Sequence, residues 1–144
     1  ELPELNLEGG AMLDDQLWLC SRGNAKRRDD ALIRLELSGV LSALANDRPP
    51  PADVLLSITR VALGDLEGAP LSLTDLTAMR GRLVFTAAAE ASSNTYDDGK
   101  CTGSVVGQLS MSMAGRGLTM SFCCARRCMA ASSASKSKQD QETR

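Results

Sequence analysis

Apolar residues alternate with polar ones along much of the chain, with the period of two that is typical of a half-buried β-strand. The clearest case in the first half is 31–43, where odd positions such as Ile33 and Leu35 are apolar and Gly39 marks a bend or bulge. The same pattern predicts strands over 16–21, 54–63 and 71–76. The stretch from Thr74 to Gly81 fits one or two helical turns, with Thr74 as the cap.

The second half of the chain repeats the alternation three times in succession. It predicts strands over about 82–92, 101–113 and 118–126, which form a C-terminal three-strand antiparallel meander over about 82–126. Paired strands must present their apolar residues to one face, so the parity of the apolar positions restricts the loop lengths. Parity favours a three-residue loop at 97–99, which pairs Phe85 with Met111. The second loop is either 114–115 or 115–116.

These strands predict an all-β fold, or a mainly β fold with one short helix, arranged as an antiparallel sandwich or a small barrel. Leu and Ala dominate the apolar set, and both residues favour helix over strand. A helix over part of 31–45 is therefore the main alternative to the strand there. We find no internal repeat in the sequence.

The chain divides into three parts by composition. Residues 1–11 form an N-terminal segment that ends in two glycines, and 12–129 form a single β-rich domain. Residues 130–144 are small and polar without apolar periodicity, which predicts a flexible tail. No apolar run approaches the ~18–20 residues that a membrane helix needs, so we expect no membrane span.

Composition restricts the chemistry of this 144-residue chain, which has a net charge of −2, no histidine and 3% aromatic residues. Without histidine there is no Ser-His-Asp or Cys-His nucleophile pair and no His metal ligand. Few aromatic residues argue against base-stacking nucleic-acid surfaces. We expect no enzyme activity, no cofactor, no catalytic residues and no small-molecule substrate, and nucleic-acid binding is not favoured.

The five cysteines are the candidates for covalent or metal chemistry. The meander brings Cys101 close to Cys128, so a Cys101–Cys128 disulfide is the leading hypothesis. The rival is a zinc site of four thiolates, from Cys101, Cys123, Cys124 and Cys128. Their spacing lacks the usual pair of Cys-x-x-Cys motifs, and adjacent strand residues point to opposite faces. Free buried thiols that pack as small apolar residues are the third interpretation.

Charged residues form two further groups. The basic residues Lys26, Arg27 and Arg28 lie in a predicted loop, and Arg126 and Arg127 follow the last strand, so together they are a candidate phosphate-contact patch. Solvated loop and sheet-edge charges are the alternative interpretation. Three adjacent Asp pairs occur in the chain, and we interpret them as turn residues because consecutive carboxylates do not normally face one substrate.

One stretch of the chain has a likeness to a known family. Gly39 to Val54, with Pro50-Pro51-Ala52 before a strand, is similar to the YbaY-type periplasmic lipoproteins, and the similarity ends after Asp65. The resemblance implies a β-sandwich, and a pilot or chaperone-type role is what some relatives would suggest. No site residue is carried over from it.

The sequence thus favours a non-enzymatic structural or assembly module that binds protein partners through a β-sandwich surface. A metal-binding or nucleic-acid-binding module based on the cysteines is the alternative, and a YbaY-like periplasmic pilot or chaperone-type sandwich is a further one. If disulfides form, we expect an extracytoplasmic or virion-associated location, and otherwise a cytoplasmic one.

Overall fold

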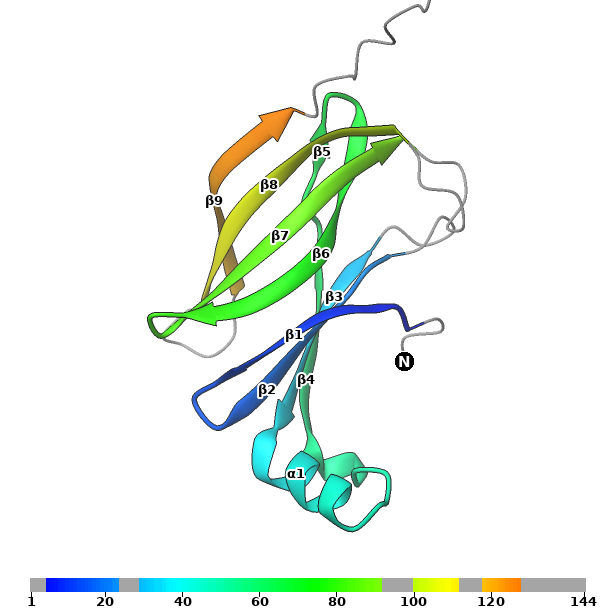
Figure 1. The fold of residues 1–144 in the computed structure, drawn as a ribbon, viewed down its shortest axis with the longest axis vertical. Helices are drawn as coiled ribbons and strands as arrows, with labels where there is room; N and C mark the ends of the chain where they lie inside the picture. Colours follow the sequence, from blue (N-terminus) through cyan, green and yellow to red (C-terminus); the bar gives the residue numbers. More distant parts are fainter. Residues whose placement is uncertain (1–4, 24–28, 92–99, 112–117, 128–144) are drawn as a thin grey trace, which may run out of the picture.

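The computed structural model describes residues 5–23, 29–91, 100–111 and 118–127. Two antiparallel sheets make up most of this part of the chain (Figure 1). The first sheet has the strand order β1-β2-β3-β4 and the second the order β5-β6-β7-β8-β9. The strands of the first sheet are β1 (Leu7–Leu13), β2 (Gln16–Ser21), β3 (Asp30–Glu36) and β4 (Leu55–Val61). Those of the second are β5 (Asp65–Leu66), β6 (Ala69–Met79), β7 (Arg82–Ala91), β8 (Lys100–Met111) and β9 (Leu118–Arg127). Helix α1 (Leu37–Ala45) and the 3-10 turn η1 (Ala52–Val54) join β3 to β4.

The mainly β fold with one short helix is as the sequence predicts. The two sheets pack in a sandwich-like arrangement, and within the described residues neither closes into a barrel. They approach each other most closely between β1 and β6 (Figure 1). A shared core fills the space between the sheets. Its fully buried members include Cys20 from the first sheet and Leu73, Phe85 and Ala89 from the second.

Gly9 is required where β1 meets β6. A Cβ atom at this position would lie 2.6 Å from the backbone N of Leu76, which is closer than real Cβ atoms approach. The Gly9-Gly10 pair, interpreted from the sequence as the end of an N-terminal segment, is therefore part of a strand. The limits of the single domain and of the tail stay predictions.

The strand predicted over 31–43 is wrong in its second half, because the chain turns into α1 at Leu37. The Glu36 side chain caps the helix by accepting hydrogen bonds from the N–H groups of Ser38 and Gly39. The Ser38 hydroxyl donates a further hydrogen bond to the same carboxylate. These hydrogen bonds, above all the one from the hydroxyl, lower the pKa of Glu36. The helix preference of Leu and Ala outweighs the alternation here. Gly39 is a helical residue packed against Val54, not a bend.

The predicted meander exists, with strand limits close to the expected ones, but its first hairpin has a different register. Phe85 lies opposite Gly107 rather than Met111, and Ala91 lies opposite Lys100. The three-residue loop at 97–99 is therefore wrong, because residues 92–99 lie between the paired ends. Parity determines which face a residue occupies but leaves even-numbered shifts open, so the faces were right and the alignment was four residues off.

Two other predictions meet the structure in this sheet. The pairing of Met111 with Leu118 is the register that a 114–115 loop requires, although the loop itself lies outside the described residues. The helical turns predicted from Thr74 to Gly81 are wrong, because β6 continues as a strand to Met79. A bulge at Thr74 shifts the alternation by one residue, which explains why the pattern lost its period there.

Candidate functional site

The side of the first sheet that faces away from the core is apolar, and we call it the outer β1–β4 face. We define it by six of the apolar residues that cross-strand pairing places on this side: Met12, Leu17, Leu19, Ile33, Leu35 and Ile58. Their chain neighbours Ala11 and Trp18 point the other way, into the core. Met12 is 64% exposed and Ile58 is 40% exposed. Ile33, at the centre of the face, is buried at 7% exposure, and Leu17, Leu19 and Leu35 are partly exposed, so the face is open mainly at Met12 and Ile58.

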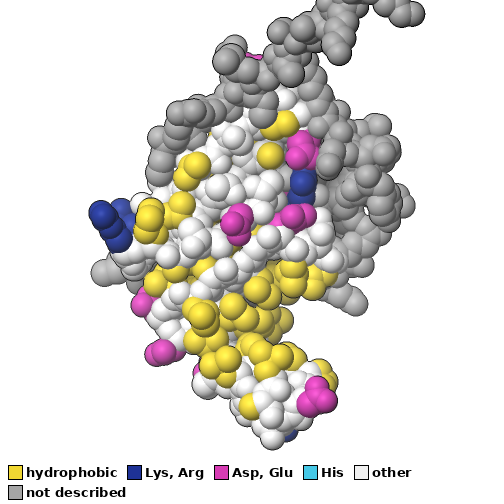
Figure 2. Space-filling model, in the orientation of Figure 1, with side chains coloured by type: hydrophobic (Ala, Val, Ile, Leu, Met, Phe, Trp, Pro, Cys, Tyr) yellow, Lys and Arg dark blue, Asp and Glu magenta, His cyan; other side chains and the backbone are white. Residues whose placement is uncertain are grey.

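Helix α1 lies at one end of the first sheet and adds to the exposed apolar surface of that half of the molecule. Leu41 and Leu44 are 53% and 70% exposed, while Ala43 is buried. Figure 2 shows apolar side chains gathered over the half that holds β1–β4 and α1. Contiguous apolar surface of this kind usually marks a site of interaction in a soluble protein.

The second sheet presents a different surface, which we call the outer β6–β9 face. The residues that pairing places on it include Ser72, Asp75, Thr77, Val84, Thr86, Ala88, Ser104, Val106 and Gln108. The hydroxyls of Thr74 and Thr86 share a hydrogen bond of 2.9 Å, and Gln108 accepts one from Arg82. Side chains here are small or polar, and the corresponding half of Figure 2 shows few apolar patches.

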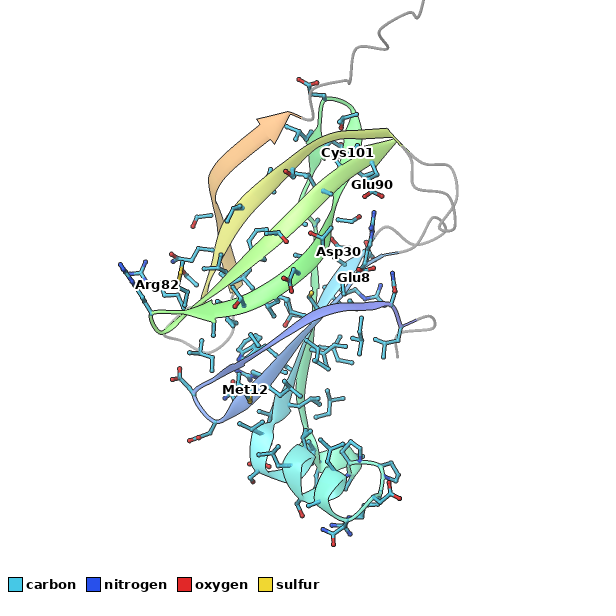
Figure 3. The ribbon with its side chains drawn as sticks, in the orientation of Figure 1. Glu8, Met12, Asp30, Arg82, Glu90 and Cys101 are labelled. Atoms are coloured by element: carbon cyan, nitrogen blue, oxygen red, sulfur yellow. The ribbon has the colours of Figure 1, made fainter. Side chains whose placement is uncertain are left out.

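Asp30 ties the two sheets together from within. It is fully buried, and its carboxylate accepts hydrogen bonds from the N–H groups of Gly23 (2.7 Å) and Leu73 (2.9 Å). Burial raises the pKa of Asp30 above 3.8, although both N–H groups act in the opposite direction. Nearby, an ion pair of 2.7 Å between Arg22 and Glu90 also links the two parts of the fold. Figure 3 labels Asp30 and Glu90, one from each sheet. Asp30 is thus a structural residue at the sheet interface.

A cleft of about 510 Å³ opens between the sheets near their turns. Trp18 and Arg34 line it from the first sheet, and Arg82 and Gln108 from the second. The Arg34 guanidinium lies over the Trp18 ring, 5.6 Å from its centroid, and its buried Nε has no hydrogen-bond partner. Asp14 is the single carboxylate among the described lining residues. The described part of the cleft therefore offers two guanidinium groups and a single carboxylate.

The described cysteines are free thiols, and they are not brought together. Cys20 is buried in the core, and burial raises its pKa to about 11, so its thiol is a packing group rather than a nucleophile. The Cys101 Sγ donates to the carbonyl of Gly103 at 3.5 Å. Cys128 lies outside the described residues, so the Cys101–Cys128 disulfide stays a prediction.

The four cysteines of the zinc hypothesis are only partly described by the structure. Cys123 and Cys124 lie in β9, at a register shift in its pairing with β8. Among the described residues, no group of three Cys, Asp or Glu side chains could hold a metal ion. Cys128 and the side chains of Cys123 and Cys124 are not described, so a zinc site with Cys101 stays a prediction.

Only two of the five basic residues of the candidate phosphate-contact patch lie in the described part of the chain. Lys26, Arg27 and Arg28 lie outside the described residues. Arg126 and Arg127 end β9, where they pair with Ser104 and Gly103. A joint basic patch therefore stays a prediction. In the described part of the chain, no helix is long and apolar enough to cross a membrane.

The outer β1–β4 face was not predicted, although the sequence carries a signal for it. Leu17-Trp18-Leu19 and Ala31-Leu32-Ile33 are uninterrupted apolar runs inside strands. Such runs are typical of strands that are covered on both faces, whereas a sheet with one wet face alternates. The structure buries one face of these strands; on the other face it buries Ala31 and Ile33 and leaves Leu17 and Leu19 partly exposed.

The sequence profile of a family of unknown function, DUF6910, matches residues 1–138. The chain belongs to that family. No match was found among curated proteins or among solved structures. The fold and the surface therefore carry the functional argument for this member of the DUF6910 family.

Proposed function

We propose that this protein is a non-enzymatic assembly module that binds another protein through the outer β1–β4 face. The observation that carries the proposal is a set of apolar side chains, exposed at Met12 and Ile58 and partly exposed at Leu17, Leu19 and Leu35, on a sheet whose opposite face is already packed. Burying apolar surface contributes about 25 cal/mol per Å², so a partner that covers this face would gain substantial free energy.

The charge distribution of the face supports protein rather than nucleic acid as the partner. None of the six residues that define the outer β1–β4 face is charged. Arg60 lies on the same side of β4 as Ile58, and it is already paired with Asp29 at 3.0 Å. Nucleic-acid surfaces need several cations free to contact phosphates, and an apolar sheet face does not supply them.

Site-specific photo-cross-linking tests the proposal. A photoreactive amino acid replaces Ile58 on the outer β1–β4 face, and in a matched control it replaces Thr59, the next residue of β4, which is also exposed but points to the opposite side. In cells that make the protein, we expect covalent protein adducts from position 58 and few from position 59. Equal adduct yields at the two positions, or none at either, would contradict the proposed function.

A further inference from the structure

The first hairpins of the two main sheets follow one structural plan, which recurs 66 residues later in the chain. The β1–β2 hairpin turns at Asp14-Asp15 and the β6–β7 hairpin at Arg80-Gly81, and all four residues have positive φ. Each first strand also carries a bulge at the same place, at Glu8 in β1 and, 66 residues later, at Thr74 in β6. A shared turn type and a shared bulge position indicate two copies of one supersecondary unit.

The repeat relates faces that have different surroundings. Leu17 and Leu19 lie on the outer β1–β4 face, but their counterparts Leu83 and Phe85 are buried in the core. Trp18 faces the core, and its counterpart Val84 lies on the outer β6–β9 face. The face of the second sheet that packs on the first sheet is therefore the equivalent of the outer β1–β4 face. The two sheets stack head to tail, not back to back.

The strands nearest to one another are the first strands of the two units. β1 lies against β6, and β4 and β9 form the opposite edges of their sheets (Figure 1). Apart from the two-residue strand β5, which pairs beside β6, each sheet is a four-stranded unit, and the two units face each other with β1 and β6 closest, as neighbouring blades do in a β-propeller. In such a stack, every blade face is covered by the next blade.

We propose that the two sheets are successive blades of a propeller-type assembly, and that the outer β1–β4 face receives the outer β6–β9 face of a second copy of this chain. The identity of this partner rests on the proposed function, which requires only that some protein covers the face. Head-to-tail contacts close into rings when the rotation allows. Propellers hold about 4–8 blades, so a ring would contain about two to four copies.

The chemistry of the two faces suits this pairing. Large apolar side chains on the outer β1–β4 face would meet small ones such as Thr86, Ala88 and Val106. The core between the sheets has the same combination, because Leu83 and Phe85 share a cluster with Ala11 and Cys20. A face of four strands and about six residues covers ~400 Å². Each contact would therefore take ~400 Å² from each copy, about half of what a standard interface takes from one partner, and a closed ring would give each copy two such contacts.

Two single variants and their mixture test the head-to-tail contact in the full chain. Ile58→Lys places a charge on the outer β1–β4 face, and Val106→Lys places one on the outer β6–β9 face; both residues are 40% exposed. Sedimentation equilibrium gives the mass of each protein, and thermal unfolding confirms that each variant folds. We expect the wild type to form a closed oligomer and each variant alone to be monomeric. The 1:1 mixture should form a dimer, because one intact face of each kind remains.

The outcomes separate this inference from the proposed function. If Val106→Lys stays oligomeric while Ile58→Lys is monomeric, the copies meet through two outer β1–β4 faces, and the head-to-tail contact is wrong. If the wild type is monomeric, the inference that the partner is a second copy of this chain is wrong. Adducts from position 58 to another protein would still support the proposed function. A mixture that stays monomeric while the wild type is oligomeric also overturns the inference.

Discussion

The outer β1–β4 face and the outer β6–β9 face belong to two antiparallel sheets that share an equivalent hairpin, yet the faces differ in the size and polarity of their side chains. The first carries Met, Leu and Ile, and the second carries Ser, Thr, Ala, Val and Gln. A strand with one wet face normally alternates between apolar and polar residues. β7 has Thr86 between Phe85 and Ala87, but its Leu83-Val84-Phe85 is an uninterrupted apolar run like Leu17-Trp18-Leu19 in β2. The two outer faces therefore differ mainly in the size of their side chains, and the larger apolar ones of the first sheet would gain more from cover by a partner.

The largest effect should come from comparing Phe85 with Leu19, which occupy equivalent positions in the two units. Phe85 is fully buried, so Phe85→Ala should lower the free energy of unfolding by about 3–5 kcal/mol. Leu19 is partly exposed on the outer β1–β4 face. At a dilution that keeps the chain monomeric, Leu19→Ala should therefore lower the free energy of unfolding by only about 1 kcal/mol. Urea unfolding measures both. Equal losses would show that Leu19 is as buried as Phe85.

A second prediction concerns what holds the two sheets together. Asp30→Ala leaves the buried N–H of Leu73 without an acceptor, so the free energy of unfolding should fall by about 1–3 kcal/mol. Asp29→Ala is the matched control, because its pair with Arg60 is more than half exposed on both sides and should contribute less than about 1 kcal/mol. Similar losses of unfolding free energy in the two variants would show that the buried hydrogen bond from Leu73 to Asp30 does not hold the sheets together.

A smaller effect is the pH dependence that Asp30 gives to stability. Its pKa is higher in the folded chain than the 3.8 of the unfolded one, so the folded state holds the proton more tightly. The contribution of Asp30 is complete below pH 3.8, and it is lost as pH rises through the folded pKa. The free energy of unfolding of the wild type minus that of Asp30→Asn should therefore fall with rising pH in this window. A difference that rises with pH would contradict the assignment.

Much of the fold follows from the sequence, for reasons that individual residues make clear. Alternation located the strands around Phe85 and Val105, because each has a buried and a wet face. It failed at 37–45, where the Glu36 cap and the Leu- and Ala-rich composition favour a helix. It also failed at Gly9-Gly10, because glycine usually ends a strand and here is needed for close contact with β6. Register depends on loop length, which parity alone does not determine.

The candidate site was harder to predict than the fold. The repeat preserves backbone features, the positive-φ turns and the bulges, but few residues. Leu7 with Leu73 and Leu17 with Leu83 are the identical pairs between 7–21 and 73–87. The outer β1–β4 face becomes visible only when Leu17, Leu35 and Ile58 are placed on one side of one sheet by strand pairing.

Oxidative footprinting of Met12 tests most directly whether the outer β1–β4 face is a covered surface. Met12 is 64% exposed on that face in the single chain, so free protein should oxidise there quickly. We expect Met12 to be protected in the assembled wild type and in Thr59→Lys, whose charge points to the other side of β4, and to be oxidised rapidly in Ile58→Lys. Equally fast oxidation of Met12 in all three proteins would contradict the account.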